Sequence, residues 1–487
     1  MDHERLLELE TERKMITTRC DGDLKLKDRI WTESRKIWTV GFPGMLSRLS
    51  SFGIMVVTQA FVGHVDQIHL AAYALTQVIS VRFSDGILLG MASATETLCG
   101  QAFGAQQHHM LGIYLQRSWI IILLTSTLML PIYVFATPIY KLLGQDDNIA
   151  NAAGSISLWF IPMVYQFGFN MSIQNYLQAQ MRNTVVAWIS SASFVAHLLL
   201  SWICVYLLEW GISGAMLAMV TAAWLTVLGE FVYIFGGWCP KTWTGFSMAA
   251  FSDIQSMFTL SVSSGVMICL EIWYYGVLVL VAGYMPDAET AIASFSICLN
   301  ITAWQFMISL GFFVAACVRV SNELGRGDAK AVKFSIKVVS ITSACIGALC
   351  SILCLIFGHS FAHLFASDEI VANAVAKLSP YLAFAVLLNS IQPVLSGVAV
   401  GAGMQGVVAY INIGSYYLIG VPVGVLLGYF TQLQIQGMWI GLMSGVIVQT
   451  LMLAYMTWIT DWDEQVSKAS GNLERWLIPA KDTAGDG

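Results

Sequence analysis

The stretch SVSSGVMICLEIWYYGVLVLVAG, residues 261–283, is an apolar run long enough to cross a membrane as one helix. Its single charged side chain, Glu271, falls near the middle, where such a helix lies deepest in the lipid. A carboxylate at that depth is costly unless it faces the protein interior and is protonated or partnered. Residues of this kind usually bind or relay ions; the alternative is a structural acid satisfied by neighbouring hydroxyl or amide groups. We therefore interpret Glu271 as a candidate ion-binding residue.

The composition places the whole chain in a membrane. Of the 487 residues, 57% are hydrophobic and 11% are charged, whereas a soluble domain carries about 25% charged residues. Apolar runs recur along almost the entire length, so the lipid bilayer is the predicted partner of most of the chain. A nucleic-acid partner is excluded, because the sequence has no clustered basic face with interleaved aromatic residues.

The apolar runs predict an all-α polytopic membrane protein with twelve transmembrane helices. The connections are short, so the helices are expected to form one compact bundle. A cytoplasmic N-terminal segment, residues 1–37, precedes the bundle, and a polar, flexible cytoplasmic tail, residues 461–487, follows it. The expected spans are 38–62, 73–99, 118–138, 156–177, 185–206, 212–236, 256–284, 292–318, 334–357, 376–400, 408–428 and 438–459.

The basic residues predict the orientation of the bundle. If the N-terminus is cytoplasmic, the segments on the cytoplasmic side hold twenty of the 24 Lys and Arg residues. The opposite side holds Lys141 alone, and the other three lie in or at the edge of spans. Positive residues accumulate on the cytoplasmic side of membrane proteins. Both termini are therefore expected in the cytoplasm, which agrees with an even number of spans.

The chain also repeats itself. IANAAGSISL (149–158) resembles VANAVAKLSP (371–380), VVAW (185–188) resembles VVAY (407–410), and GISGAMLAMV (211–220) resembles QIQGMWIGLM (434–443). Each match has an offset of 222 or 223 residues, which indicates two homologous halves. We expect an N-lobe at 38–236, an inter-lobe cytoplasmic linker at 237–255 and a C-lobe at 256–460. Parallel repeats of this kind predict a transporter with its substrate cavity between the halves.

The C-terminal half is rich in polar groups within its spans. Asn389 and Gln392 are three residues apart on one helix face near the centre of the tenth span. With Glu271 they are predicted to line one wet pocket, because an intramembrane acid needs polar neighbours. The alternative is a set of unrelated interhelical hydrogen bonds. The other predicted members of the pocket are Tyr274, Asn300, Trp304, Gln305, Asn412 and Tyr416.

Two further features are assigned from position alone. Pro43 lies between Gly41 and Gly44 in the first span, which predicts a hinge used in gating or a static kink. Glu230 is expected near the cytoplasmic end of the sixth span, from which its carboxylate would reach the membrane interface, so it is not predicted to be functional.

No metal motif, nucleophile–base pair or nucleotide-binding loop is found in the sequence. An enzymatic activity and a bound cofactor are therefore not expected.

Several motifs together resemble those of a known family. They are MASATETLCGQAFGAQ (91–106), NYLQAQMRNTVVAWIS (175–190), WTGFS (243–247), VMICLEIWYYGVLV (266–279), VRVSNELGRGD (318–328) and LLNSIQPVLSGVAVGAG (387–403). They look like the plant branch of the MATE (multidrug and toxic compound extrusion) family, and the resemblance covers nearly all of residues 30–460. It implies two six-helix lobes in a V shape around a central cavity, and export of organic solutes in exchange for protons.

The resemblance also implies roles for individual residues. Glu271 matches the acidic residue of the seventh helix implicated in proton coupling, and Pro43 falls where bending of the first helix is discussed for the family. Asn389 stands where some plant relatives carry Asp; the Asn found here matches relatives resembling vacuolar flavonoid transporters, and it puts a mechanism with two acids in doubt. The first-span acid of many prokaryotic members is missing here. Glu271 is therefore the principal candidate for coupling, with protons in place of a cofactor.

These features together predict a monomeric proton-coupled antiporter that moves flavonoid-type or other bulky organic solutes, including xenobiotics, from the cytoplasm to the vacuole. The sequence DHERLL, from Asp2 to Leu7, fits an acidic dileucine signal and favours the vacuolar membrane over the plasma membrane. The alternatives are an anion channel or uniporter with Glu271 as its gate, plasma-membrane efflux of organic cations, and a membrane receptor or enzyme. A receptor or enzyme would leave the twofold repeat unexplained. The sequence does not identify the substrate.

The charge asymmetry leads to a test of orientation. In sealed vesicles, an epitope tag at residue 1 or at residue 487 should be accessible to antibody only from the cytoplasmic face, because the basic segments are retained there. A tag placed beside Lys141 is the control and should show the opposite accessibility. A terminal tag that is reached from the luminal face would contradict the predicted orientation.

Overall fold

The computed structural model describes residues 26–282, 288–365, 369–431, 433 and 435–476, and this part of the chain is built of helices joined by turns. The dileucine pattern predicted at Asp2 to Leu7 lies outside the described residues. The first half comprises α2 (Leu26–Val65), α3 (Gln67–Thr76), η1 (Gln77–Val81), α4 (Arg82–Gly104), α5 (His108–Val134), α6 (Ala136–Leu142), α7 (Asp147–Ala179), α8 (Asn183–Trp202), η2 (Ile203–Leu207), α9 (Gly211–Tyr233) and η3 (Ile234–Trp238).

The second half follows a short connection that contains η4 (Met248–Phe251). This connection lies against α5, where Gln116 donates to the carbonyl of Gly245 at 3.0 Å and accepts from the amide of Ser247 at 2.9 Å. The helices of the second half are α10 (Ile254–Ala282), α11 (Ala288–Arg326), α12 (Ala329–Phe365), α13 (Glu369–Gly401), α14 (Gln405–Asn412), η5 (Ile413–Gly420), α15 (Val421–Phe430), α16 (Ile435–Ile459) and α17 (Trp462–Trp476).

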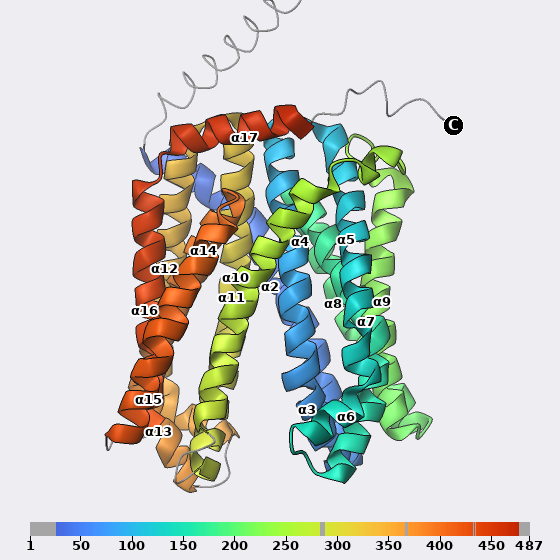
Figure 1. Cartoon of the computed structure of the whole chain (residues 1–487), viewed down its shortest axis with the longest axis vertical. Helices are drawn as coiled ribbons and strands as arrows, with labels where there is room; N and C mark the ends of the chain where they lie inside the picture. Colours follow the sequence, from blue (N-terminus) through green and yellow to red (C-terminus); the bar gives the residue numbers. More distant parts are fainter. Residues whose placement is uncertain (1–25, 283–287, 366–368, 432, 434, 477–487) are drawn as a thin grey trace, which may run out of the picture.

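The two halves pack their helices in matching ways. In the first half, α7 contacts α4, α5 and α9. In the second half, α13 contacts α11, α12 and α16, which follow in the same order along the repeat. Figure 1 shows the two groups of helices side by side, meeting at the upper end and diverging toward the lower end. The repeat in the sequence therefore corresponds to a repeat of helix packing.

Ten of the described helical segments are long and apolar enough to cross a membrane. The other two expected spans, 73–99 and 156–177, fall mainly on α4 and α7, which run alongside the rest in Figure 1. Both of these helices bury polar side chains, among them Glu96 and Gln101 on α4 and Gln174 on α7. Because their neighbours are protein and not lipid, these helices need not be apolar.

The ends of several elements differ from the predicted boundaries. Among the described residues, α2 extends back to Leu26, well inside the segment expected to precede the bundle, and the span expected at 408–428 is divided into α14, η5 and α15. The prediction of a flexible tail from residue 461 is wrong for 462–476, which form α17. Trp462 and Ala469 are buried in one hydrophobic cluster, and α17 contacts α4, α11 and α12. Trp462 and Ala469 are seven residues apart, a spacing that places both on one helix face.

Lys and Arg residues gather at one end of the bundle, which we call the basic end. It holds the start of α2, the turn between α11 and α12, and α17, which crosses the top of the molecule in Figure 1. Basic residues at this end include Arg29, Arg35, Lys36, Arg319, Arg326, Lys330, Lys333 and Lys468.

Candidate functional site

Glu271 lies on α10 and is partly buried in the C-lobe. Its Oε1 atom accepts a hydrogen bond of 3.0 Å from Nε2 of Gln392 on α13, and the same nitrogen also donates to Ser396 at 3.1 Å. Gln392 is itself buried. An amide group can donate to an ionised carboxylate through its nitrogen or accept from a protonated one through its oxygen. Gln392 is therefore a partner that suits both charge states of Glu271.

A chain of hydrogen bonds begins beside this carboxylate. Tyr416 lies within electrostatic range of Glu271, and its hydroxyl donates to Oε1 of Gln449 at 2.5 Å. Nε2 of Gln449 donates to Oδ1 of Asn412 at 2.7 Å, and the nitrogen of Asn412 donates to the carbonyl of Met267 at 2.9 Å. The chain joins η5, α16, α14 and α10, so it fixes the helices around Glu271 relative to one another.

A tyrosine pair packs next to the same chain. The rings of Tyr274 and Tyr416 stack with centroids 4.3 Å apart, and the Tyr274 hydroxyl donates to the carbonyl of Gly441 at 3.0 Å. A Cβ atom on Gly420 would lie 2.3 Å from the Tyr274 hydroxyl oxygen, so only glycine leaves room for this ring. Tyr416 lies within the π-helix η5. Such segments often occur at functional sites, and no sequence pattern predicted this one.

Among the described hydrogen bonds, none joins the remaining predicted members of the pocket to Glu271. Gln305 donates to Ser309 and Ser390, at 2.7 and 2.8 Å. Trp304 is 41% exposed and packs edge-on against Phe52 of α2, in the other lobe. Asn389 is buried, but the described hydrogen bonds do not join it to Glu271. Asn300 lies on α11, and its side chain is outside the described residues.

Pro43 is buried within α2, which continues as one helix on both sides of it. Its neighbours Gly41 and Gly44 face Gly311 of α11, where an added Cβ would lie 3.5 and 3.7 Å from the Gly311 backbone. The first helix of one lobe therefore passes close to α11 of the other at this proline. The role of Pro43 as a hinge stays a prediction.

Two acidic residues in the N-lobe were missed or misjudged from the sequence. The expectation that Glu230 reaches the membrane interface is wrong, because its side chain is completely buried and bonded to Gln174. Glu96 on α4 is also buried and interacts electrostatically with Arg48 on α2. Both acids could have been found by the argument that singled out Glu271, since each lies in a helix of the bundle. Among the described residues, no cluster of His, Cys, Asp and Glu could hold a metal ion.

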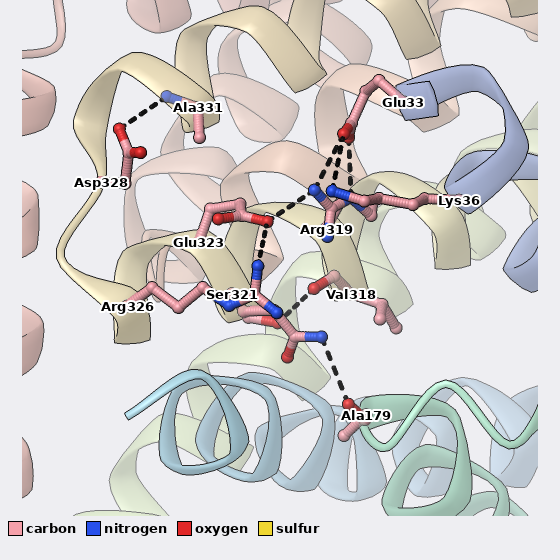
Figure 2. A network of polar contacts seen from close by, with 11 residues as sticks. Glu33, Lys36, Ala179, Val318, Arg319, Ser321, Glu323, Arg326, Asp328 and Ala331 are labelled. Carbon is pink, nitrogen blue, oxygen red and sulfur yellow. Dashed lines mark hydrogen bonds and ion pairs between the residues drawn. The ribbon is translucent and has the colours of Figure 1, made fainter. Parts of the chain in front are cut away.

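A network of charged side chains joins the lobes at the basic end (Figure 2). Arg319 of α11 donates from Nε to Oε1 of Glu33 on α2 at 2.7 Å, and from Nη2 to Oε2 of the same carboxylate at 3.0 Å. Arg319 also donates to Glu323, one turn along its own helix, at 2.5 Å. Arg326 and Lys36 flank the two carboxylates at 3.1 and 3.7 Å. Arg319, Glu33 and Glu323 are all buried, so each charge depends on its partners.

Further contacts between the lobes lie at the same end. The Thr97 hydroxyl and Gln101 amide of α4 donate to the carbonyls of Val400 and Gly401 at the end of α13, at 2.7 and 3.4 Å. Asn322 donates to the carbonyl of Ala179 at 3.3 Å. A Cβ atom on Gly104 would lie 2.0 Å from the Asn322 carbonyl oxygen, so the two helix backbones touch. The structure is thus closed between the lobes at the basic end.

Comparison with known proteins identifies the family. A family model described as MatE matches residues 43–203 and 264–426, which together are most of the chain. The chain belongs to the MATE family. This confirms the resemblance found in the motifs and the predicted fold of two homologous lobes. MATE proteins are efflux transporters, so the protein is a multi-pass membrane transporter of small molecules.

Similar MATE proteins span nearly the same length. Protein DETOXIFICATION 24 of Arabidopsis thaliana is 51% identical over 93% of this chain and 91% of its own, and Protein DETOXIFICATION 25 of the same plant is 50% identical over 93% and 92%. The crystal structure of the eukaryotic MATE transporter AtDTX14 matches with a TM-score of 0.87 and 28% identity, covering 92% of this chain and all of the other. The Vibrio cholerae MATE transporter VcmN, in its bent form, shares the fold with a TM-score of 0.77, at 16% identity over 92% of this chain and 99% of its own.

The chain of hydrogen bonds beside Glu271 leads to a stability prediction. The substitution Gln449→Leu keeps the side-chain size but leaves the Tyr416 hydroxyl and the Asn412 oxygen without a partner. Each unsatisfied buried group costs about 1–3 kcal/mol, so the variant should show a clearly lower Tm than wild type in detergent. Thr450→Val is the control, because the Thr450 hydroxyl bonds only to its own helix. Equal Tm values for the two variants would show that the chain does not stabilise the C-lobe.

Proposed function

We propose that this MATE transporter is a proton-coupled antiporter that exports organic solutes from the cytoplasm by alternating access, with Glu271 as its coupling residue. The observation that supports this most is the partnering of Glu271. Its described hydrogen-bond partner is a neutral amide, that of Gln392, and Tyr275 and Tyr416 lie within electrostatic range of it. A carboxylate in a helix bundle without a cationic partner gains stability by taking up a proton.

The contacts between the lobes support the alternating-access part of the proposal. The basic end is closed by an ion pair, hydrogen bonds and direct backbone contact. A transporter with parallel repeats works by moving one lobe relative to the other around a site between them. If the basic end faces the cytoplasm, the described state is closed to the cytoplasm. Release of solute on the opposite side would belong to this state, and loading would require the basic end to open.

Coupling then follows from the hydrogen bond of Glu271. In the ionised state the carboxylate accepts from Gln392, as described. On the acidic side of the membrane it takes up a proton, and the neutral carboxyl no longer draws the amide nitrogen toward it. Because α10 and α13 are held together partly by this bond, the two charge states favour different arrangements of the C-lobe. The proton and the solute would each favour one arrangement, which produces exchange by population shift.

The membrane in which the protein lies and the class of its solute are proposed from the sequence. The dileucine pattern at Asp2 to Leu7 favours the vacuolar membrane. The resemblance to vacuolar flavonoid transporters favours flavonoid-type secondary metabolites as solutes. An anion channel or uniporter with Glu271 as its gate remains the competing function, and it differs in a measurable way: such a protein cannot move solute uphill in a pH gradient.

The proposal is tested by Glu271→Gln, which mimics the protonated acid with nearly the same shape. In proteoliposomes with an acidic interior, the wild type should accumulate a radiolabelled flavonoid glycoside or a fluorescent organic cation against its gradient. The variant should lose this accumulation because no proton leaves or enters at residue 271. It should keep exchange of labelled for unlabelled solute without a pH gradient, since the solute site is unchanged.

The control is Glu464→Gln, which removes an exposed carboxylate paired with Lys468 on α17. This variant should accumulate solute like the wild type. Uphill transport by a well-folded Glu271→Gln protein would show that the coupling proton is carried elsewhere. Downhill transport by the wild type that does not respond to the pH gradient would favour the channel or uniporter.

A further inference from the structure

The N-lobe holds a buried acid that the proposed function does not use. Glu230 lies on α9 and is completely buried. Its Oε1 atom accepts from Nε2 of Gln174 on α7 at 3.2 Å, and that nitrogen also donates to Oδ1 of Asn170 at 2.9 Å. In the alternative orientation of the Asn170 amide, which gives up the bond from Gln174, its nitrogen lies 3.3 Å from both oxygens of Glu230. Two amides of α7 therefore surround one carboxylate of α9.

No positive charge balances this carboxylate in the described part of the chain, where its interaction is with Gln174. The elements packed against α9 are α2, α7, α8 and the π-helices η2 and η3. Charged or titratable residues of these elements have partners other than Glu230. The guanidinium of Arg182, just before α8, also bonds elsewhere. The pairs are Arg48 with Met171 and Glu96, Tyr176 with Thr242, His197 with Thr58, and Arg182 with Tyr233.

A second observation points to a ligand at the same place. Oε1 of Gln174 is buried and has no hydrogen-bond partner, although the other end of the same amide bonds to Glu230. A buried acceptor left alone is costly. With a proton on Glu230, a half-turn of the Gln174 amide would bring this oxygen to face the carboxyl hydroxyl, which can donate to it, and would move the nitrogen to the place that the oxygen had occupied. The pair can thus form one hydrogen bond with the acid ionised and another with it neutral.

The internal repeat relates this cluster to the site in the C-lobe. Asn170 and Gln174 precede Gln392 and Ser396 by 222 residues, the offset that relates the halves of the sequence. The donor to the acid differs between the lobes: Gln392, which corresponds to Asn170, donates to Glu271, whereas Gln174, which corresponds to Ser396, donates to Glu230. The same pair of positions on α7 and α13 therefore lies beside an acid in each lobe. The acids come from different helices, α9 and α10, so they are not equivalent in the repeat themselves.

We propose that Glu230, Gln174 and Asn170 form a second proton-binding site, in the N-lobe, which binds and releases a proton at the carboxylate of Glu230. One carboxylate and two amides in a fully buried position suit a proton. A hard metal cation such as Mg²⁺ or Ca²⁺ takes about six or more oxygen ligands. The proton comes from solvent water and returns to it. The role of this site in transport rests on the proposed function, whereas the binding of a proton to Glu230 does not.

The site is tested on the purified full-length protein in lipid by infrared difference spectroscopy between mildly acidic and mildly alkaline buffer. A protonated buried carboxyl gives its own carbonyl stretching band, which disappears on ionisation. The wild type should show two such bands, of which Glu230→Gln removes one and Glu271→Gln removes the other. Gln174→Leu should keep the Glu230 band but change the pH at which it disappears, because it removes the partner of both charge states. The control Glu464→Gln should keep both bands.

The outcomes separate this inference from the proposed function, since no substrate is needed. If Glu271→Gln removes a band and a well-folded Glu230→Gln protein retains the wild-type spectrum, the proposed proton site in the N-lobe is wrong. The proposal that Glu271 is the coupling residue is unaffected by that result. A Glu230 band that persists unchanged across the pH range would show a permanently protonated structural acid and would also overturn the inference. A band that responds to sodium chloride but not to choline chloride at equal ionic strength would replace the proton with a metal cation.

Discussion

The bidentate ion pair between Arg319 and Glu33 is the interaction on which the arrangement of the lobes depends. Its partners come from α11 and α2, in different lobes, and Glu33 is paired with Arg319 while the basic end is closed. Breaking a buried pair costs about 3–5 kcal/mol when a charge is left alone. Glu323 reduces that cost, because it stays beside Arg319 on the same helix when Glu33 leaves. The network therefore holds the basic end closed but permits it to open.

The same requirement, that a buried charge needs a partner, shapes the interior of each lobe. Glu271 is held by the amide of Gln392, and Glu230 by the amide of Gln174. A Lys or Arg partner would fix the acid in its ionised form, whereas an amide accepts either form. The ion pair between Glu33 and Arg319 thus lies between the lobes at the basic end, whereas Glu271 and Glu230, with amide partners, lie within the lobes. This division suits a transporter in which lobe movement responds to protonation.

The helical fold, the twofold repeat and the pairing of Glu271 with Gln392 could be predicted, because each depends on local hydropathy, on internal similarity or on the need of an intramembrane acid for a partner. The ion-pair network at the basic end could not be predicted. Glu33 and Arg319 are 286 residues apart, and the sequence around each resembles that of other polar helix ends. Gln449 and Glu230 each lie in an apolar run, as Glu271 does, so the same argument predicts a buried polar role for both residues. The membership of Trp304 and Gln305 in the Glu271 pocket stays a prediction, because spacing along one helix does not fix its rotation toward an acid on another helix.

The central claim is that opening at the basic end requires separation of Glu33 from Arg319. It is tested by hydrogen–deuterium exchange of residues 97–105 and 318–326 in the full-length protein in lipid nanodiscs. We predict that Glu33→Gln speeds exchange in both segments by roughly tenfold or more, since 1.4 kcal/mol corresponds to a factor of ten. Glu323→Gln, which leaves the inter-lobe pair intact, should preserve the protection of residues 97–105. Wild-type protection of both segments in the Glu33→Gln protein would contradict the claim.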